Sequence, residues 1–282
     1  LSRAREAARR ASCESNLKQL GFICKMYADE SRGQLFPSSK MWKCPPGKTG
    51  GDMVINGIQI YPEYLTDPAI LLCPSAEVGS DPEEAFDEAD DLTSIVVTNA
   101  GETAVIAAPN RAFYPCEVSD DSTCYVYLPW VVVIPRITDR NWTGVTDMDS
   151  LTASPVGRDA AALIRFVKDT MDAVDGKEPD LATAIRNVDR DIVMTVGIGT
   201  VRMPRLKEGV ERFLITDINH PAAGALAQTT IPVMADWVDS RSVRFNHIPG
   251  GANVLWMDGH VSFVKYPDRW PVNQLMAVLQ TL

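Results

Sequence analysis

The residue types best suited to chemistry gather near the C-terminal end of the chain, between His247 and His260. Two histidines and the carboxylate of Asp258 could bind a metal ion or move a proton, because imidazole and carboxylate groups serve as zinc ligands and as general acids or bases. Asp258-Gly259 also stands between two short apolar runs, which is the strongest short-range signal for a β-hairpin. One interpretation leads to an enzyme and the other to a structural subunit.

A metal site in this segment has few histidines to draw on. The chain of 282 residues contains 3 histidines, and the His-Glu-x-x-His pattern of many zinc enzymes does not occur. His247 and His260 could still meet across the hairpin with Asp236 or Asp258 and bind zinc or calcium. The sequence favours a structural role for the segment, and we assign no metal ligand in it.

The structural interpretation explains the same residues directly. Asp258-Gly259 is expected at the centre of a tight turn, because a positive φ costs little for glycine and is tolerated by aspartate. Gly250-Gly251 allows a sharp turn or a close approach of a neighbouring strand. His247 is expected to donate a hydrogen bond to a carbonyl or carboxylate and so to hold the loop before the hairpin. The residues assigned to this structural motif are His247, Gly250, Gly251, Asp258, Gly259 and His260.

Other catalytic patterns are missing from the sequence. It has no Gly-x-Ser-x-Gly nucleophile elbow, and Gly197-Ile198-Gly199 lacks the third glycine and the following helix of a dinucleotide-binding loop. We therefore expect a protein that is not an enzyme and that needs no cofactor. Binding of Ca²⁺ by acidic loops, with the acidic run from Asp81 to Asp91 as the densest, stays open as an alternative.

Charge and hydropathy exclude two classes of partner. The formal net charge of −10 argues against a nucleic-acid partner, since phosphate binding requires a basic surface. No run of about 18 apolar residues occurs, so no segment of this sequence is expected to span a membrane by itself. Because Leu1 begins inside a helical pattern, we expect membrane attachment only through a segment that is missing from this chain.

The cysteines indicate disulfides in an exported protein, with free buried thiols as the alternative. Six cysteines occur without a Cys-x-x-Cys pair, which disfavours zinc ribbons and thioredoxin-like chemistry. Cys13 and Cys24 fall in one predicted helix about 16 Å apart, so each needs another partner or stays free. The expected pairs are Cys116 with Cys124, and Cys44 with Cys73.

The elements that must position these residues form an α+β fold. Residues 2–31 have apolar side chains at three- and four-residue steps, which predicts one amphipathic helix that stops near Gly33. Its first half is rich in Ala and Arg and is expected to project from the domain, whereas its second half should dock. The rest predicts a loop over 34–60, strands near 103–108, 124–134, 191–196 and 231–234, and helices near 158–174, 179–188, 205–213 and 271–282.

Two segments together resemble a known family. Residues 2–21 resemble the C-terminal half of the N-terminal helix of bacterial type IV pilin-like proteins, or pseudopilins, of the Planctomycetes type. The segment from His247 to Asp258-Gly259-His260 resembles the prepilin-type processing-associated motif at the C-terminus of these proteins. The family motif has nine residues between the histidine and Asp-Gly, and this chain has ten.

The resemblance implies a fold and a role. It implies a long N-terminal helix followed by a mainly antiparallel β-sheet domain with extra helices and long loops. Residues 1–33 would be the assembly helix and 34–282 the globular α+β domain, with an insertion around 76–200. The resemblance further implies an extracellular or cell-surface subunit that forms homo-oligomers or filaments. The residues assigned to self-assembly are Arg3, Arg5, Arg9, Arg10, Ala4, Ala8 and Ala11.

Alternatives and accessory features stay open at this point. The chain could instead be a minor pseudopilin of a type II secretion-like system, an ion-binding surface module, or an exported hydrolase that uses His247 and Asp258. Secretion or pilus machinery is the expected partner besides other copies of the chain. Asn141-Trp142-Thr143 fits the N-glycosylation pattern, which makes Asn141 a candidate for modification.

Overall fold

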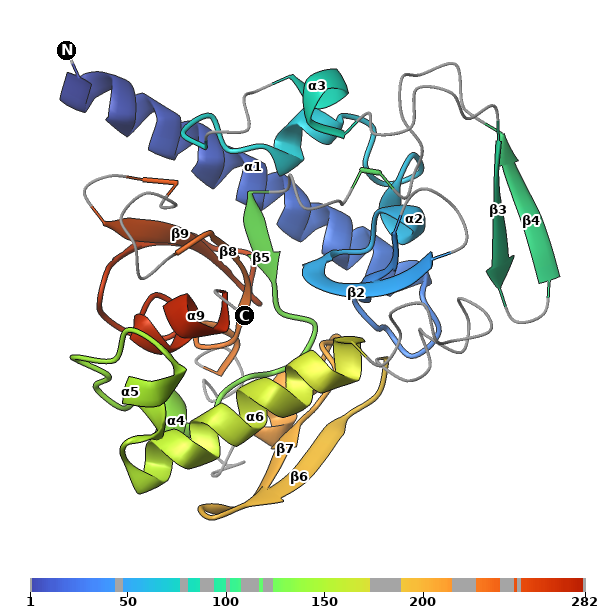
Figure 1. Cartoon of the computed structure of the whole chain (residues 1–282). Helices are drawn as coiled ribbons and strands as arrows, with labels where there is room; N and C mark the ends of the chain where they lie inside the picture. Colours follow the sequence, from blue (N-terminus) through green and yellow to red (C-terminus); the bar gives the residue numbers. More distant parts are fainter. Residues whose placement is uncertain are drawn as a thin grey trace.

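A long helix lies along one side of the molecule in the computed structural model, which describes residues 2–43, 48–76, 81–86, 94–99, 102–107, 117–118, 124–172, 189–214, 227–238, 246–247 and 250–280. This helix, α1 (Ser2–Glu30), packs on the body from Cys13 onward, while its N-terminal end extends beyond the body (Figure 1). The predicted projection of the whole first half is therefore too long, because Cys13 is buried. Ser31 N donates to Tyr27 O, and Gly33 at φ 83° then turns the chain away. The predicted helix and its stop at Gly33 are confirmed.

A four-stranded antiparallel sheet forms the centre of the body. The strand order is β10-β9-β8-β5, so three strands from the C-terminal third pair with one strand from the middle of the chain. The strands are β5 (Tyr125–Tyr127), β8 (Pro232–Asp236), β9 (Gly251–Trp256) and β10 (Val261–Lys265). The predicted α+β class, with a long helix on an antiparallel sheet, is confirmed. The domain boundary at 33/34 stays a prediction, although β5 shows that the segment 76–200 contributes to the central sheet.

The inner strands of this sheet are buried on both faces, because α1 packs on one face and an apolar cluster to which α6 (Pro155–Asp172) contributes lies on the other. Alternate residues along each strand point to opposite sides. Leu255 belongs to the apolar cluster that includes Leu17 and Leu20 of α1. Its neighbours Val254 and Trp256 belong to the cluster that includes the helix α6. This two-sided packing explains why every residue of β9 is buried.

Smaller elements surround this core. Three hairpins pair β1 (Ser39–Lys43) with β2 (Lys48–Ile55), β3 (Ser94–Asn99) with β4 (Glu102–Ala107), and β6 (Ile192–Val196) with β7 (Gly199–Met203). The short helices are α2 (Gly57–Ile60), η1 (Pro68–Leu71), α3 (Pro82–Phe86), α4 (Pro135–Thr138), α5 (Met148–Thr152), η2 (Val210–Phe213) and α9 (Gln274–Leu279). Within the described residues, no helix has the length and apolar character that a bilayer crossing requires.

Three local predictions are wrong in extent or type. Residues 34–60 contain β1, β2 and α2 rather than a loop, and the register of β1 with β2 shifts twice, so no clean alternation marks the pair. The strand predicted over 124–134 ends at Tyr127, close to Pro129, which has no N–H for a ladder. The helix predicted over 205–213 is a single 3-10 turn, because Arg205 forms a β-bridge with Trp130. The helix predicted over 179–188 lies outside the described residues.

Candidate functional site

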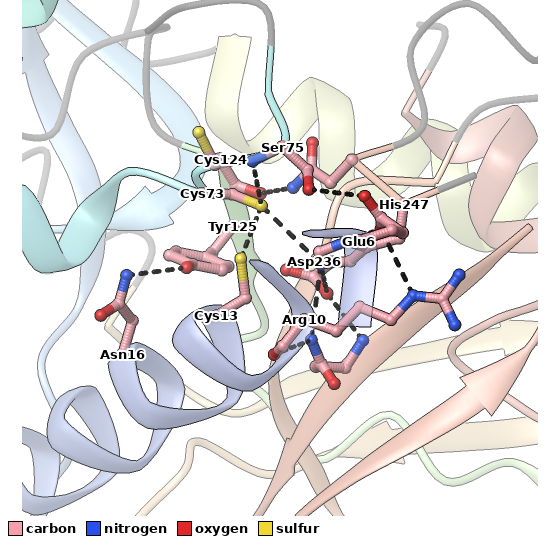
Figure 2. Close-up of polar contacts among 12 residues, drawn as sticks. Glu6, Arg10, Cys13, Asn16, Cys73, Ser75, Cys124, Tyr125, Asp236 and His247 are labelled. Atoms are coloured by element: carbon pink, nitrogen blue, oxygen red, sulfur yellow. Dashed lines mark hydrogen bonds and ion pairs between the residues drawn. The ribbon is translucent and has the colours of Figure 1, made fainter. Parts of the chain in front are cut away.

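Four buried side chains with metal-binding atoms converge where α1 crosses the sheet (Figure 2). Cys13 comes from α1, Cys73 follows η1, Asp236 ends β8, and His247 precedes β9. Their thiol, carboxylate and imidazole atoms all lie within 4.8 Å of one another. All four residues have no exposed surface. Four segments that are distant in the sequence therefore form one polar centre inside the core, which we call the Cys-Asp-His centre.

The backbone around Gly251 sets the position of His247. His247 and Gly251 form an isolated antiparallel β-bridge, which holds the histidine against the first residue of β9. A Cβ atom on Gly251 would lie 2.7 Å from the carbonyl oxygen of Val264 and would overlap the ring of Phe263. Only glycine lets β10 approach Gly251 this closely. Because Gly251 also pairs with His247, the same glycine fixes the position of His247 beside the sheet.

Two carboxylates hold the imidazole of His247. Its Nδ1 lies 2.8 Å from Oε1 of Glu6 on α1, and its Nε2 lies 3.1 Å from Oδ2 of Asp236. Burial alone lowers the pKa of His247, but the hydrogen bonds with Asp236 and Cys73 outweigh burial and raise the pKa to about 10. The two carboxylates therefore favour the protonated form of the imidazole.

Asp236 has one oxygen that no described residue satisfies. Its Oδ2 accepts a hydrogen bond of 2.7 Å from the backbone N–H of Asn253, in addition to the contact with His247. Its Oδ1 is buried and has no hydrogen-bond partner among the described residues. A buried acceptor without a partner carries a desolvation cost. The carboxylate therefore has capacity for a further ligand contact.

The two sulfur atoms of the centre are in contact. Sγ of Cys13 lies 2.6 Å from Sγ of Cys73, and Sγ of Cys73 accepts a hydrogen bond of 3.4 Å from the backbone N–H of Ser75. Contact with Cys13 and burial hold the pKa of the Cys73 thiol far above its usual range. Both cysteines are free thiols.

The expected disulfide pairs do not appear within the described residues. Cys73 is a buried free thiol that contacts Cys13, and Cys124 is buried. Cys44 and Cys116, the other members of the two expected pairs, lie outside the described residues. The sequence left Cys13 without a partner because helix geometry excluded Cys24, whereas the fold provides Cys73 from a segment 60 residues away.

Asp258 and His260 do not take part in this centre. Nδ1 of His260 lies 2.6 Å from Oδ1 of Asp258 at the exposed hairpin turn, and the ring of His260 stacks on Trp256. The alternative zinc or calcium set that combined His247 with His260 or Asp258 is therefore wrong, although its pairing of His247 with Asp236 is present.

The turn itself is shifted by one residue from the prediction, because Trp256 O accepts from Gly259 N and leaves Met257 and Asp258 in the centre. Gly259 follows at φ 90°.

The residues assigned to self-assembly lie on the first half of α1. Ala4, Arg5, Ala8, Arg9 and Ala11 are exposed, and Arg3 lies in the first turn. Arg10 is half-buried and contacts its own domain, because its Nε lies 3.3 Å from Oε1 of Glu6 and its guanidinium lies over the ring of Phe263.

Two accessory candidates have simple surroundings. Asn141 is exposed, and its side-chain oxygen accepts a hydrogen bond of 2.8 Å from the backbone N–H of Thr143. The acidic run is described from Asp81 to Phe86, and its remaining residues to Asp91 lie outside the described part of the chain. Neither feature joins the Cys-Asp-His centre.

Sequence reasoning did not find the centre as a unit. Cys73 and His247 are 174 residues apart, so no short motif can connect them. Glu6 belongs to an Ala/Arg-rich helix and gives no sign of contact with a residue near the other end of the chain. Two signals were available: the possible pairing of His247 with Asp236, and the excess of cysteines without a local partner, with Cys13 among them.

Comparison with known proteins adds one match. Residues 2–52 match a family described as "Protein of unknown function (DUF1559)", and this region contains α1, β1 and most of β2. No curated protein and no solved structure matches the chain. The similarity is thus restricted to the long helix and the segment directly after it.

Proposed function

We propose that this protein is an exported, pilin-like structural subunit that assembles with copies of itself through the outward face of α1, and that it is not an enzyme. The match of residues 2–52 to the DUF1559 family supports a pilin-like relationship. The long helix on an antiparallel sheet supports the same relationship. The observation that carries the proposal is a second apolar stripe on α1, opposite the docked one.

This stripe faces solvent and has two parts, small residues in the first half of α1 and two large apolar residues in the second half, with the exposed Lys18 between them. Residues at three-, four- and seven-residue steps share one side of a helix. The exposed residues on this side are Ala4, Ala8, Ala11, Ser15, Phe22 and Met26. Phe22 is 69% exposed and Met26 is 47% exposed, although the docked stripe of the same helix is fully buried. Large apolar side chains aligned on an exposed helix face are typical of an interaction surface.

The charges on α1 are compatible with a parallel, staggered arrangement of copies. The exposed Arg5 and Arg9 lie in the first half of the helix, and the exposed Asp29 and Glu30 lie at its end. A staggered neighbour would place the basic half of one helix beside the acidic end of another. Each exposed ion pair contributes little by itself, so the pairs would set the register more than the affinity. A repeated, non-closing contact of this kind produces a helical polymer.

The centre at His247 does not favour the hydrolase alternative. His247 is fully buried, so a substrate cannot reach its imidazole in this conformation. Asp258, the other residue of that hypothesis, pairs with His260 at the turn and not with His247. We infer that secretion or pilus machinery delivers the subunit to the cell surface and that a minor, non-polymerising pseudopilin is the alternative role.

Assembly can be tested with one double variant and a matched control. Phe22→Glu with Met26→Glu places two charges on the exposed stripe, whereas Val193→Glu changes an apolar residue that is 56% exposed on β6. Sedimentation velocity and negative-stain microscopy should show large assemblies for the wild type and for Val193→Glu, and monomers for the double variant. A wild-type chain that stays a monomer at all concentrations would contradict the proposal, as would unchanged assembly of the double variant.

A further inference from the structure

We propose that Cys13, Cys73, Asp236 and His247 form a structural zinc site that fixes α1 to the central sheet. The proposal goes beyond self-assembly and depends on other residues, because the assembly stripe lies on the opposite side of α1. It assigns a ligand to a buried polar cluster that neither the fold nor the assembly function explains.

The donor set is one that zinc prefers. Structural zinc sites are tetrahedral, with sulfur, imidazole nitrogen and carboxylate oxygen as ligands. The centre supplies two thiols, one imidazole and one carboxylate, and their ligand atoms lie within 4.8 Å of one another. All four side chains are buried, so the protein fills the coordination sphere and leaves no open position for a substrate. This closed arrangement is typical of a structural site rather than a catalytic one.

Contacts around the four ligands match those of a metal site. A histidine that binds a metal through one nitrogen commonly donates its other N–H to a carboxylate, which orients the ring. Nδ1 of His247 lies 2.8 Å from Glu6, so Nε2 faces the other three ligands. The backbone N–H of Ser75 donates to Sγ of Cys73 and would stabilise a thiolate there. Oδ1 of Asp236 lacks a hydrogen-bond partner among the described residues, and coordination of the carboxylate to zinc would offset that loss.

The binding step balances in charge and protons. The two thiols of Cys13 and Cys73 each lose one proton to become thiolates, and Nε2 of His247 binds the ion without a proton. Zinc then binds two thiolates, one carboxylate and one neutral imidazole, and the displaced protons pass to the solvent. The bound site carries a single negative charge. Release of protons on zinc binding is the general behaviour of such sites.

A disulfide between Cys13 and Cys73 is the competing state. The Sγ–Sγ separation of 2.6 Å lies closer to the bond length of about 2.05 Å than to the separation of about 3.8 Å for two thiolates on one tetrahedral zinc, so zinc binding requires the two sulfur atoms to move apart. A thiol oxidant would take two electrons and two protons from the pair. The disulfide accounts for two of the four residues and leaves Oδ1 of Asp236 without a partner. Zinc accounts for all four, so the arrangement of the centre favours zinc.

The direct test measures metal and thiols on the full chain. The protein is purified without chelator in buffer with Zn²⁺, dialysed, and analysed by plasma mass spectrometry and by intact mass under denaturing, non-reducing conditions. We expect about one zinc per chain and an intact mass in which Cys13 and Cys73 are both reduced. A chain without zinc whose mass is lower by two hydrogens, with the crosslink mapped to Cys13 and Cys73, would overturn the proposal in favour of the disulfide.

Variants and a spectroscopic probe keep the test independent of folding. Cys73→Ser and Asp236→Asn should each lower the zinc content severalfold, whereas Cys24→Ser, at a buried cysteine of α1 outside the centre, should retain it. Co²⁺ added to the reduced wild-type chain should give the thiolate-to-metal absorption and the intense visible bands of a tetrahedral site. Absence of both zinc and these bands in folded, reduced protein would refute the site. Neither readout depends on assembly, so this proposal and the proposed function can fail separately.

Discussion

The imidazole of His247 lies 2.8 Å from the carboxylate of Glu6, and 241 residues of chain separate the two. This contact joins the segment before β9 to the second turn of α1. The helix has no large apolar side chain before Cys13, so its first turns cannot be held by hydrophobic burial. Glu6 and the nearby Arg10 are therefore the side chains that fix this part of α1 to the body.

Glu6→Ala should destabilise the protein although Glu6 lies near the chain terminus. The substitution leaves the buried His247 with one carboxylate in place of two, and a hydrogen bond to a charged group contributes about 1.5–3 kcal/mol. Urea unfolding should show a loss of that size. Glu14→Ala, which removes an exposed pair with Lys18 on the same helix, should cost less than about 0.5 kcal/mol. Equal effects of the two substitutions would refute the role of Glu6.

Arg205→Met should be among the most destabilising single substitutions in the body. The guanidinium is buried, donates hydrogen bonds to the carbonyl oxygens of Phe36, Pro37 and Pro129, and forms an ion pair with Asp189. Removal of one partner from a buried ion pair costs about 3–5 kcal/mol. Chemical denaturation measures this loss.

Arg202→Met serves as the control for Arg205, because Arg202 comes from the same hairpin region but is largely exposed. Its side chain is 59% exposed and pairs with Asp191. The expected loss is about 1 kcal/mol or less. A small effect at Arg205 would show that the carbonyl groups around it find other donors.

Gly251→Ala and Gly250→Ala form a matched pair at adjacent positions. A Cβ at Gly251 would lie 2.7 Å from Val264 O, so β10 must shift, and overpacking of this kind costs about 1–3 kcal/mol. A Cβ at Gly250 would lie 3.6 Å from the nearest atom, which is an ordinary contact. Thermal unfolding should therefore show a lower Tm for Gly251→Ala and little change for Gly250→Ala. A similar Tm for both would contradict the close approach of β10.

The contribution of Asp191 should disappear in acid. Partial burial raises the pKa of Asp191, but the hydrogen bonds from Arg202 and from the backbone N–H of Arg205 outweigh it and leave the pKa below 3.8. Because the folded-state pKa is the lower one, the carboxylate stabilises the fold above about pH 4. This stabilisation is lost as the pH falls from 3.8 through the folded-state pKa.

The measurement for Asp191 compares two proteins across pH. Asp191→Asn should be less stable than the wild type at pH 7, and the difference in unfolding free energy should shrink as the pH falls below 4. When Arg202 is also replaced by Gln, Asp191→Asn should cost less unfolding free energy at pH 7, because Asp191 has already lost its hydrogen bond from Arg202. A difference that stays constant from pH 7 to pH 3 would contradict this assignment.

Local patterns in the sequence predicted the elements whose signals are local. The three- and four-residue steps from Leu17 to Ala28 predicted α1, and Asp258-Gly259 predicted the hairpin of β9 and β10. The β1–β2 pair was missed because its bulges interrupt the alternation that identifies strands. The strand predicted over 124–134 was too long because Pro129, which has no N–H for a ladder, lies close to the end of β5.

The Cys-Asp-His centre could not be predicted because its members come from four separate segments. Cys13 and Cys73 are 60 residues apart, and each looks like an ordinary buried cysteine in its own segment. Asp236 ends a strand whose other residues are apolar, and the sequence indicated it only as one of two carboxylates that could join His247. Only the order β10-β9-β8-β5, with α1 across it, brings the four together, and pairing at that range is a tertiary property.

The position of this centre on α1 also has a mechanical consequence. Its attachments at Glu6 and Cys13 lie between the projecting end of the helix and the apolar residues from Leu17 onward. A tensile load applied to the projecting end of α1 therefore reaches the central sheet first through His247, Cys73 and Asp236. The hydrophobic interface of the second half of α1 would bear that load only after these polar attachments had yielded.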